Sequence, residues 1–255
     1  MFKRFYLIFQ PLLPWRSKLI FGRGCLSLAL LLLLPGLQSC QKPVSRESSI
    51  ADMAPLDIAP AARRFQVLSD QSQLIVLVYR DGRLANLGHN HVISSNDLQG
   101  EIYLADTLQN TALELRLPVM TLDVDLPQYR SDAGDEFPGT LDQDTVSGTR
   151  ANMLSEQQLN SEIWPEIVMR SREVRGSLPD STVQIDVAVR SHIYTLEVPV
   201  HVILADDRMT VTGSFQVNQT DLGLVPFSVM MGALKVKDQL DIRFTIVAEA
   251  ARPAL

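Results

Sequence analysis

The chain has 255 residues, with 23 basic and 29 acidic side chains, a net charge of −6 at pH 7, and two cysteines. If a basic amino-terminal signal is removed, 18 basic and 29 acidic residues remain, a net charge of −11. Such a surface argues against a nucleic-acid-binding protein and disfavours electrostatic attachment to anionic lipid headgroups.

The first 40 residues look like a bacterial lipoprotein signal. Five basic and no acidic residues precede Cys40, and a short apolar run from Leu26 to Leu34 ends at Pro35. A basic start, a short apolar run and small residues are typical of a secretory signal, and this run is too short to span a bilayer comfortably. Residues 37–40, LQSC, resemble a lipobox, so we expect residues 1–39 to be the signal and Cys40 to be lipidated. The alternative is an uncleaved membrane anchor.

The residues after Cys40 indicate the compartment. In the lipoprotein families that the signal resembles, an Asp after the lipidated Cys favours retention in the inner membrane. Gln41 therefore suggests a periplasmic protein anchored to the inner leaflet of the outer membrane. Because Cys25 lies in the signal and Cys40 would carry lipid, the folded part has neither a disulfide nor a cysteine-based metal site. Its stability must come from one core, for which roughly 190 residues suffice.

Residues 40–64 form a segment rich in Pro, Ala and Ser, which predicts a flexible tether. From Phe65 the sequence alternates between apolar and polar residues, the pattern of antiparallel strands with one buried face. The alternating apolar runs are 74–78, 98–104, 113–117, 183–189, 196–202, 209–217 and 240–246. Asp81-Gly82 is a turn signal, and Pro199 predicts an edge or a bulge in its strand.

Seven or eight such strands close into a barrel or form a sandwich. One region interrupts the alternation. Residues 126–147 predict an acidic loop, residues 146–160 predict a helix, and Ser155 with Gln158 predicts a capping box for a second short helix. An insertion of this kind usually covers one end of a barrel. The acidic residues match no EF-hand spacing, so a solvated loop is favoured over a Ca²⁺ site.

Three passages in order resemble the YceI-like family, and together they span Phe65 to Ala250. The first runs from Asp70 to Ile102, and the second from Asn152 through Trp164-Pro165-Glu166-Ile167 to Ser171. The third contains Gly213-Ser214-Phe215 and Thr220–Leu224, and closes on Leu240–Ala248. The resemblance implies an all-β, antiparallel, lipocalin-like barrel of eight strands with a short helical insertion, over residues 65–252. It also implies a secreted protein that binds a polyisoprenoid lipid.

The strand alternation points to an apolar lumen, which would accept an apolar chain of isoprenoid or fatty-acyl type. The alternative is a barrel filled by its own side chains, with a structural role in the envelope. The residues expected to line the lumen share the inward parity of their strands. They are Val76, Val78, Ile102, Leu104, Leu115, Val187, Val200, Phe215, Phe227 and Phe244.

Polar candidates are few. His89 and His91 lie two residues apart and would share one face of a strand. They could contact a ligand headgroup, hydrogen-bond the backbone, or, with His192 and His201, form a metal or haem site. Tyr129, Arg130 and Arg150 could contact a phosphate at the barrel mouth.

No catalytic motif is present: the sequence lacks a nucleophile elbow, a P-loop and a dinucleotide fingerprint. The sequence therefore predicts a binding protein, not an enzyme, that needs no cofactor and carries one apolar lipid. The expected partners are that lipid and the membrane, through the anchor, and a dimer remains open.

Overall fold

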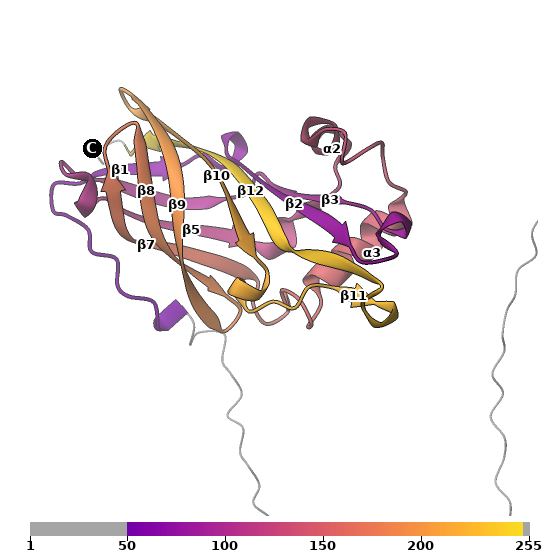
Figure 1. Ribbon diagram of the computed structural model, residues 1–255. Coiled ribbons are helices and arrows are strands. Elements are labelled where there is room, and N and C mark those ends of the chain that lie inside the picture. The colour runs from indigo at the N-terminus through magenta and orange to yellow at the C-terminus, as the bar shows by residue number, and fades with distance from the viewer. Residues whose placement is uncertain (1–49, 252–255) are drawn as a thin grey trace, which may run out of the picture. The chain divides into compact units, whose positions relative to one another are not determined.

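The computed structural model describes residues 50–251, which form a β-barrel with two helices (Figure 1). Cys40 and the expected signal lie outside the described residues. The helices are α2 (Pro127–Ala133) and α3 (Gln143–Leu154). The strands are β1 (Arg63–Val67), β2 (Gln73–Asp81), β3 (His91–Ser95), β4 (Gln99–Leu104), β5 (Ala112–Pro118), β6 (Asp123–Val124), β7 (Glu166–Gly176), β8 (Asp180–Val189), β9 (His192–Ala205), β10 (Arg208–Asn218), β11 (Ser228–Val229) and β12 (Leu234–Ala250). None of the helices within residues 50–251 has the length and apolar character needed to cross a membrane.

The barrel closes through the long strand β12. The hydrogen-bonded order is β1-β4-β5-β7-β8-β9-β10-β12, and β1 returns to pair with β12 at Phe65 and Ala250. β1 pairs with residues 248–250 of β12, and β2 pairs with residues 235–245 of the same strand, so β1 and β2 form one bent wall strand. β4 pairs with β1 and β3 pairs with β2, so β3 and β4 form a second bent wall strand. All pairs are antiparallel, so the predicted eight-stranded antiparallel barrel is confirmed.

Alternation along the strands produces the core. Inward residues from successive strands pack on one another around Phe65, which is fully buried. Ser72 sits at the bend between β1 and β2, and its buried hydroxyl accepts the amide hydrogen of Val247 at 3.0 Å. This bond satisfies a β12 amide where the wall changes direction, as a buried donor requires.

One seam of the wall is open. β9 pairs with β10 only from residues 201–205 to residues 208–212, although β9 begins at His192 and β10 runs on to Asn218. The two strands therefore separate over the half of the barrel that contains the start of β9, as Figure 1 shows. Pro199 lies in the separated part, as expected for an edge, since proline has no amide hydrogen to give to a neighbour.

The insertion differs from its prediction in three ways. A helix, α2, occupies part of the expected loop, and it begins with Pro127 at the first helical position, where proline is well tolerated. α3 starts three residues earlier than expected, because Asp142 caps it by accepting the Thr145 amide at 2.9 Å. Ser155 ends α3 and does not begin a second helix.

The insertion covers the barrel in two places. Phe137, which follows α2, is buried against Leu77 and Val92 on the outer face of β2 and β3. Residues of α3 reach one end of the barrel and line its cavity. The expectation that the whole insertion covers one end is therefore wrong for its first half.

The segment before β1 is attached to the barrel over its described part. Met53 is only 4% exposed and packs against Val168 of β7 and Ala188 of β8. Val168 lies near the start of β7, and Ala188 lies near the end of β8. Residues 50–53 therefore do not behave as the free tether expected for residues 40–64.

Candidate ligand-binding cavity

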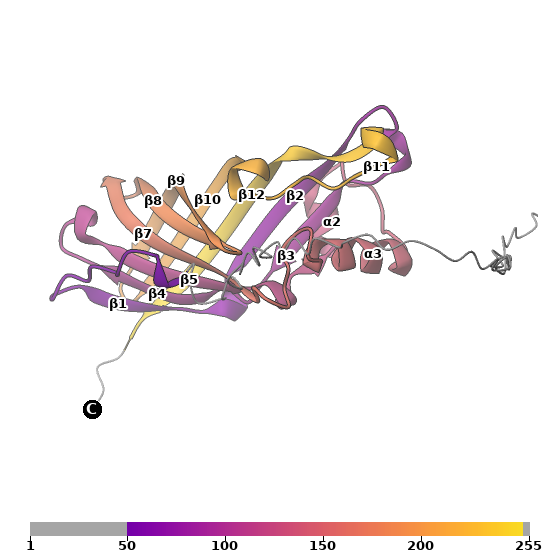
Figure 2. The ribbon, with the colours of Figure 1, turned by 90° about the horizontal axis from the view of Figure 1, so that it is seen from below.

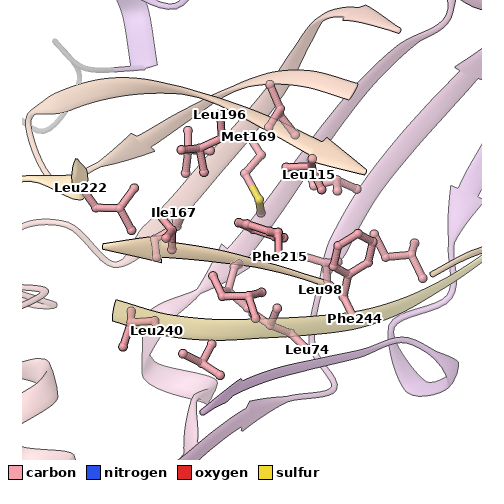
Figure 3. Close-up of a pocket in the computed structure, with 18 of the residues that line it drawn as sticks. Leu74, Leu98, Leu115, Ile167, Met169, Leu196, Phe215, Leu222, Leu240 and Phe244 are labelled. Carbon is pink, nitrogen blue, oxygen red and sulfur yellow. The ribbon is translucent and has the colours of Figure 1, made fainter. Parts of the chain in front are cut away.

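The barrel encloses a cavity of about 450 Å³ that is lined almost wholly by apolar side chains (Figure 3). Every wall strand contributes, and the lining contains no Asp, Glu, Lys or Arg. Figure 3 shows the side chains of Met169, Phe215 and Phe244 pointing into the same space from different strands. A cavity with such walls offers dispersion contacts and few hydrogen bonds, which suits an apolar molecule.

All ten residues expected to line the lumen do so. They are Val76, Val78, Ile102, Leu104, Leu115, Val187, Val200, Phe215, Phe227 and Phe244. Nine of them lie on strands whose alternation fixes their direction, and Phe227 lies in the loop before β11. Their contact with a ligand stays a prediction.

The cavity is packed at one end and open at the other. Lining residues such as Val183, Val198 and Val211, near the 176–180 and 205–208 turns, are buried. Lining residues toward the opposite end, such as Val78 and Leu240, keep part of their surface exposed. We call this opposite end the mouth; it lies where α3, the 155–163 segment and the 219–227 loop meet the barrel.

The separated seam lies on the mouth side and is covered by the 219–227 loop. Gly223 has φ +67°, and a Cβ there would lie 1.9 Å from the Tyr194 hydroxyl of β9. Only glycine allows the loop to approach β9 this closely. Leu222 and Leu224, on either side, line the cavity. Burial raises the pKa of Tyr194, as expected where a loop covers a phenol.

Gly213 opens space on the other side of the seam. A Cβ at Gly213 would lie 2.4 Å from the Phe244 ring and 2.7 Å from the carbonyl oxygen of Pro199. The absence of a side chain therefore lets Phe244 pass over β10 toward the cavity. The sequence marks Gly213 only as part of the passage Gly213-Ser214-Phe215 and indicates no role for it.

One polar cluster borders the cavity near the mouth. Asp125, with φ +56°, is buried between His91 and Arg130. Its carboxylate contacts His91 Nδ1 at 2.6 Å, and it accepts hydrogen bonds from the Val92 amide at 2.9 Å and from Arg130 at 2.7 Å. Burial raises the pKa of Asp125, but the bonds from His91, Val92 and Arg130 outweigh it and hold that pKa below 3.8. Of the three charged or titratable members, only His91 lines the cavity.

Arg130 does not lie where the sequence suggested. It is 2% exposed, and besides Asp125 it donates to the backbone oxygens of Asn90, Pro138 and Gly139. A phosphate at the mouth is therefore not its partner, and its role is to hold the insertion against β3. Tyr129 donates to Asn96, and Arg150 donates to the carbonyl of Met120, so neither points into the cavity.

The histidines do not converge. His89 is exposed, with its ring 6.4 Å from that of His91, while His201 is bonded to Asp180 on the outer surface. Among residues 50–251, no group of three His, Cys, Asp or Glu side chains is close enough to hold a metal ion. The pairing of His91 with a carboxylate differs from the backbone contact that the sequence suggested.

Other lining residues escaped the sequence reasoning. The 219–227 loop and the 155–163 segment supply Leu159, Leu222 and Leu224, and α3 supplies Met153. These residues come from loops and from a helix with no clear apolar stripe, where no strand alternation indicates direction. The family passage Thr220–Leu224 was the one signal that marked part of this set.

Comparison with known proteins places the fold. Neither a protein-family model nor a curated protein matches the sequence. Among solved structures, BcnA of Burkholderia cenocepacia has a TM-score of 0.52 and 12% identity, over 71% of this chain and 98% of BcnA.

Two further structures have lower scores. A polyisoprenoid binding domain from Saccharophagus degradans, implicated in plant cell wall breakdown, has a TM-score of 0.49 and 11% identity, over 73% of this chain and 98% of the domain. The YCEI protein of Campylobacter jejuni has a TM-score of 0.45 and 5% identity, over 61% of this chain and 82% of that protein. The chain therefore has the barrel fold of BcnA.

Proposed function

We propose that this protein is a binding protein that holds one long apolar ligand inside its barrel. The observation that carries the proposal is the cavity of about 450 Å³, open at one end and free of Asp, Glu, Lys and Arg. Its volume falls in the range of roughly 300–1,000 Å³ that is usual for ligand sites. A barrel filled by its own side chains would retain only small voids, since protein interiors are close-packed.

The energetics favour a long chain over a small molecule. Each buried CH₂ contributes about 0.8 kcal/mol, and association costs roughly 4–15 kcal/mol. Burial of a chain of about 15 carbons would contribute roughly 12 kcal/mol, which offsets most or all of the association cost. A longer chain would contribute more than the association costs. A single phenyl-sized ligand would not offset the cost. Isoprenoid and fatty-acyl chains are the ligand classes that meet this condition.

The apolar lining of the cavity supports a binding role. The buried charged groups nearest to the cavity, Asp125 and Arg130, are bonded to each other and to backbone atoms. The polar lining residues near the mouth also include Asn152 and Gln219, which could contact a headgroup. We further propose that the protein works in the periplasm, anchored through lipid on Cys40 to the inner leaflet of the outer membrane, as a carrier, store or sensor.

Mass spectrometry of the barrel, native and after organic extraction, tests the proposal. We expect about one long-chain lipid per barrel, or stoichiometric uptake of a polyisoprenoid or fatty acid offered to the empty protein. Val187→Asp, which places a carboxylate in the lumen, should abolish loading. Gln184→Asp, on the same strand but facing outward, should not. An empty barrel that takes up neither test ligand would overturn the proposal and favour a structural protein.

A further inference from the structure

The tip of the β2–β12 extension carries exposed apolar side chains. We define the hairpin tip as residues 80–90 and 225–237. Its apolar members are strongly exposed: Leu87 63%, Val225 72%, Phe227 40%, Met230 64% and Met231 106%. Figure 2 shows the extension projecting beyond the barrel at the end where α3 lies. Apolar groups gathered in this way on an otherwise acidic protein mark an interaction surface.

The two loops of the hairpin tip form one surface. Leu84 donates its amide hydrogen to Ala233 at 2.8 Å, and Val236 donates to Phe227 at 2.9 Å. Gly82 has φ +95°, and a Cβ there would lie 2.5 Å from the carbonyl oxygen of Ala233. The close approach of the loops thus depends on a glycine. As a result Leu87, Phe227 and the two methionines are held on the same projection.

The backbone of the methionine pair is strained. Met230 has φ +51° and Met231 has φ +54°, a region that side chains other than glycine rarely adopt. Two such residues in succession persist only where the surrounding structure imposes them, and strain of this kind gathers at functional sites. Here the strained turn directs two long, flexible apolar side chains into solvent.

The charge of the hairpin tip is opposite to that of the barrel. Residues 50–251 contain 15 basic and 28 acidic side chains. The segments 80–90 and 225–237 contain four basic side chains, Arg80, Arg83, Lys235 and Lys237, against one acid, Asp81. Asp81 is bonded to Lys235 at 3.1 Å. The two lysines are also the only lysines between residues 50 and 251.

The hairpin tip is continuous with the mouth of the cavity. Phe227 belongs to both, since it lines the cavity and is 40% exposed. The described chain also begins at this end of the barrel, because Met53 packs beside the start of β7 and the end of β8. A surface that met the hairpin tip would thus face the opening through which an apolar ligand enters.

We propose that the hairpin tip docks the barrel onto the surface of an anionic lipid bilayer. The methionines, Leu87 and Phe227 enter the boundary between headgroups and acyl chains, while Arg80, Arg83 and the lysines contact anionic headgroups. The negative net charge of the whole chain disfavours contact with anionic headgroups. At the hairpin tip, the local cluster of basic residues outweighs this effect. Docking itself does not depend on the proposed ligand-binding function; only its purpose, ligand exchange with the membrane, rests on it.

Vesicle co-sedimentation tests the proposal without a lipid anchor. Residues 43–255, which contain every strand of the barrel, are used, with folding checked by thermal unfolding. We expect binding to vesicles that contain phosphatidylglycerol, weak binding to pure phosphatidylcholine, and weaker binding at high salt. Met230→Ser/Met231→Ser and Lys235→Gln/Lys237→Gln should each lower the affinity for anionic vesicles on the order of tenfold. Ile203→Ser/Leu204→Ser removes a similar exposed apolar pair, 57% and 40% exposed, at the opposite end and should change nothing.

Two results would overturn the proposal. One is that the unaltered barrel does not bind anionic vesicles; the other is that the methionine variant binds as well as the Ile203/Leu204 control. A dimer in sedimentation that disappears with the methionine variant would assign the hairpin tip to a second copy of the chain instead. Ligand content is measured on the same samples. An empty barrel that still docks would leave this inference standing while removing the proposed function.

Discussion

Gln158 and Val225 are joined by a hydrogen bond across the mouth of the cavity: the Gln158 side chain donates to the Val225 carbonyl oxygen at 2.7 Å. Gln158 follows α3 in the insertion, and Val225 belongs to the loop that covers the separated seam. Gln158 and the neighbours of Val225, Leu224 and Phe227, line the cavity. This single exposed bond therefore links the two segments that would have to part for a bulky ligand to enter.

We expect Gln158→Ala to accelerate ligand entry and release together, with little change in the dissociation constant. An exposed hydrogen bond of this kind contributes only about 0.5–1.5 kcal/mol, so the barrel should remain folded. Stopped-flow fluorescence with a fluorescent fatty acid measures both rates. Gln157→Ala, at the exposed neighbouring position, is the matched control. Equal rates in the two variants would show that the bond does not restrain the mouth.

Met169→Trp tests whether the lumen is hollow. Its side chain points into the cavity (Figure 3), so a larger ring should occupy empty volume, leave thermal stability unchanged or higher, and reduce ligand uptake. Val183→Trp, in the packed half, should instead destabilise the fold by about 1–3 kcal/mol, because overpacking forces strain. Urea unfolding and lipid uptake measure the two effects. A similar loss of stability in both variants would indicate a filled barrel.

The sequence predicted the wall of the barrel better than its mouth. Strand alternation fixes which side chains point inward, so residues such as Val187 and Phe244 could be assigned without coordinates. Arg130 could not, because its burial depends on three carbonyl oxygens supplied by residues 90, 138 and 139, which are brought together only by the fold. The residues of the mouth come from loops, where no repeat specifies direction.

Asp125→Asn should destabilise the protein by roughly 3–5 kcal/mol, because it leaves the buried Arg130 without its counter-charge. The pKa of Asp125 is lowered in the folded protein, so its carboxylate stabilises the fold above pH 4 and this stabilisation is lost as the pH falls through the lowered pKa. The difference in unfolding free energy between the two proteins should therefore be constant near neutral pH and decrease below pH 4. Denaturant unfolding between pH 3 and pH 8 measures it.

Asp123→Asn, at an exposed position two residues away, serves as the control and should have little effect. A loss of less than about 1 kcal/mol in Asp125→Asn would mean that Arg130 is satisfied by backbone carbonyls alone. A stability difference that grows as the pH falls would contradict the lowered pKa of Asp125.

Hydrogen exchange should reveal the open seam. Residues 208–212 of β10 have partners on both sides, whereas residues 213–218 pair with β12 alone. We expect every second amide from Gly213 to Asn218 to exchange quickly, and those of residues 209–211 slowly. Exchange followed by NMR resolves the two groups. Uniform protection along β10 would mean that β9 and β10 pair over their full length in solution. In that case, added ligand should not change the amide exchange rates.

The open seam has a consequence for how the barrel behaves among its own copies. A separated β9 presents hydrogen-bonding groups that another chain could extend into a larger sheet, which is the usual route to edge-to-edge aggregation. Pro199 removes one donor from this edge, Glu197 adds a charge on the outer face, and the 219–227 loop covers the edge at Tyr194. Together these three features deny the separated edge of β9 to a strand of another copy.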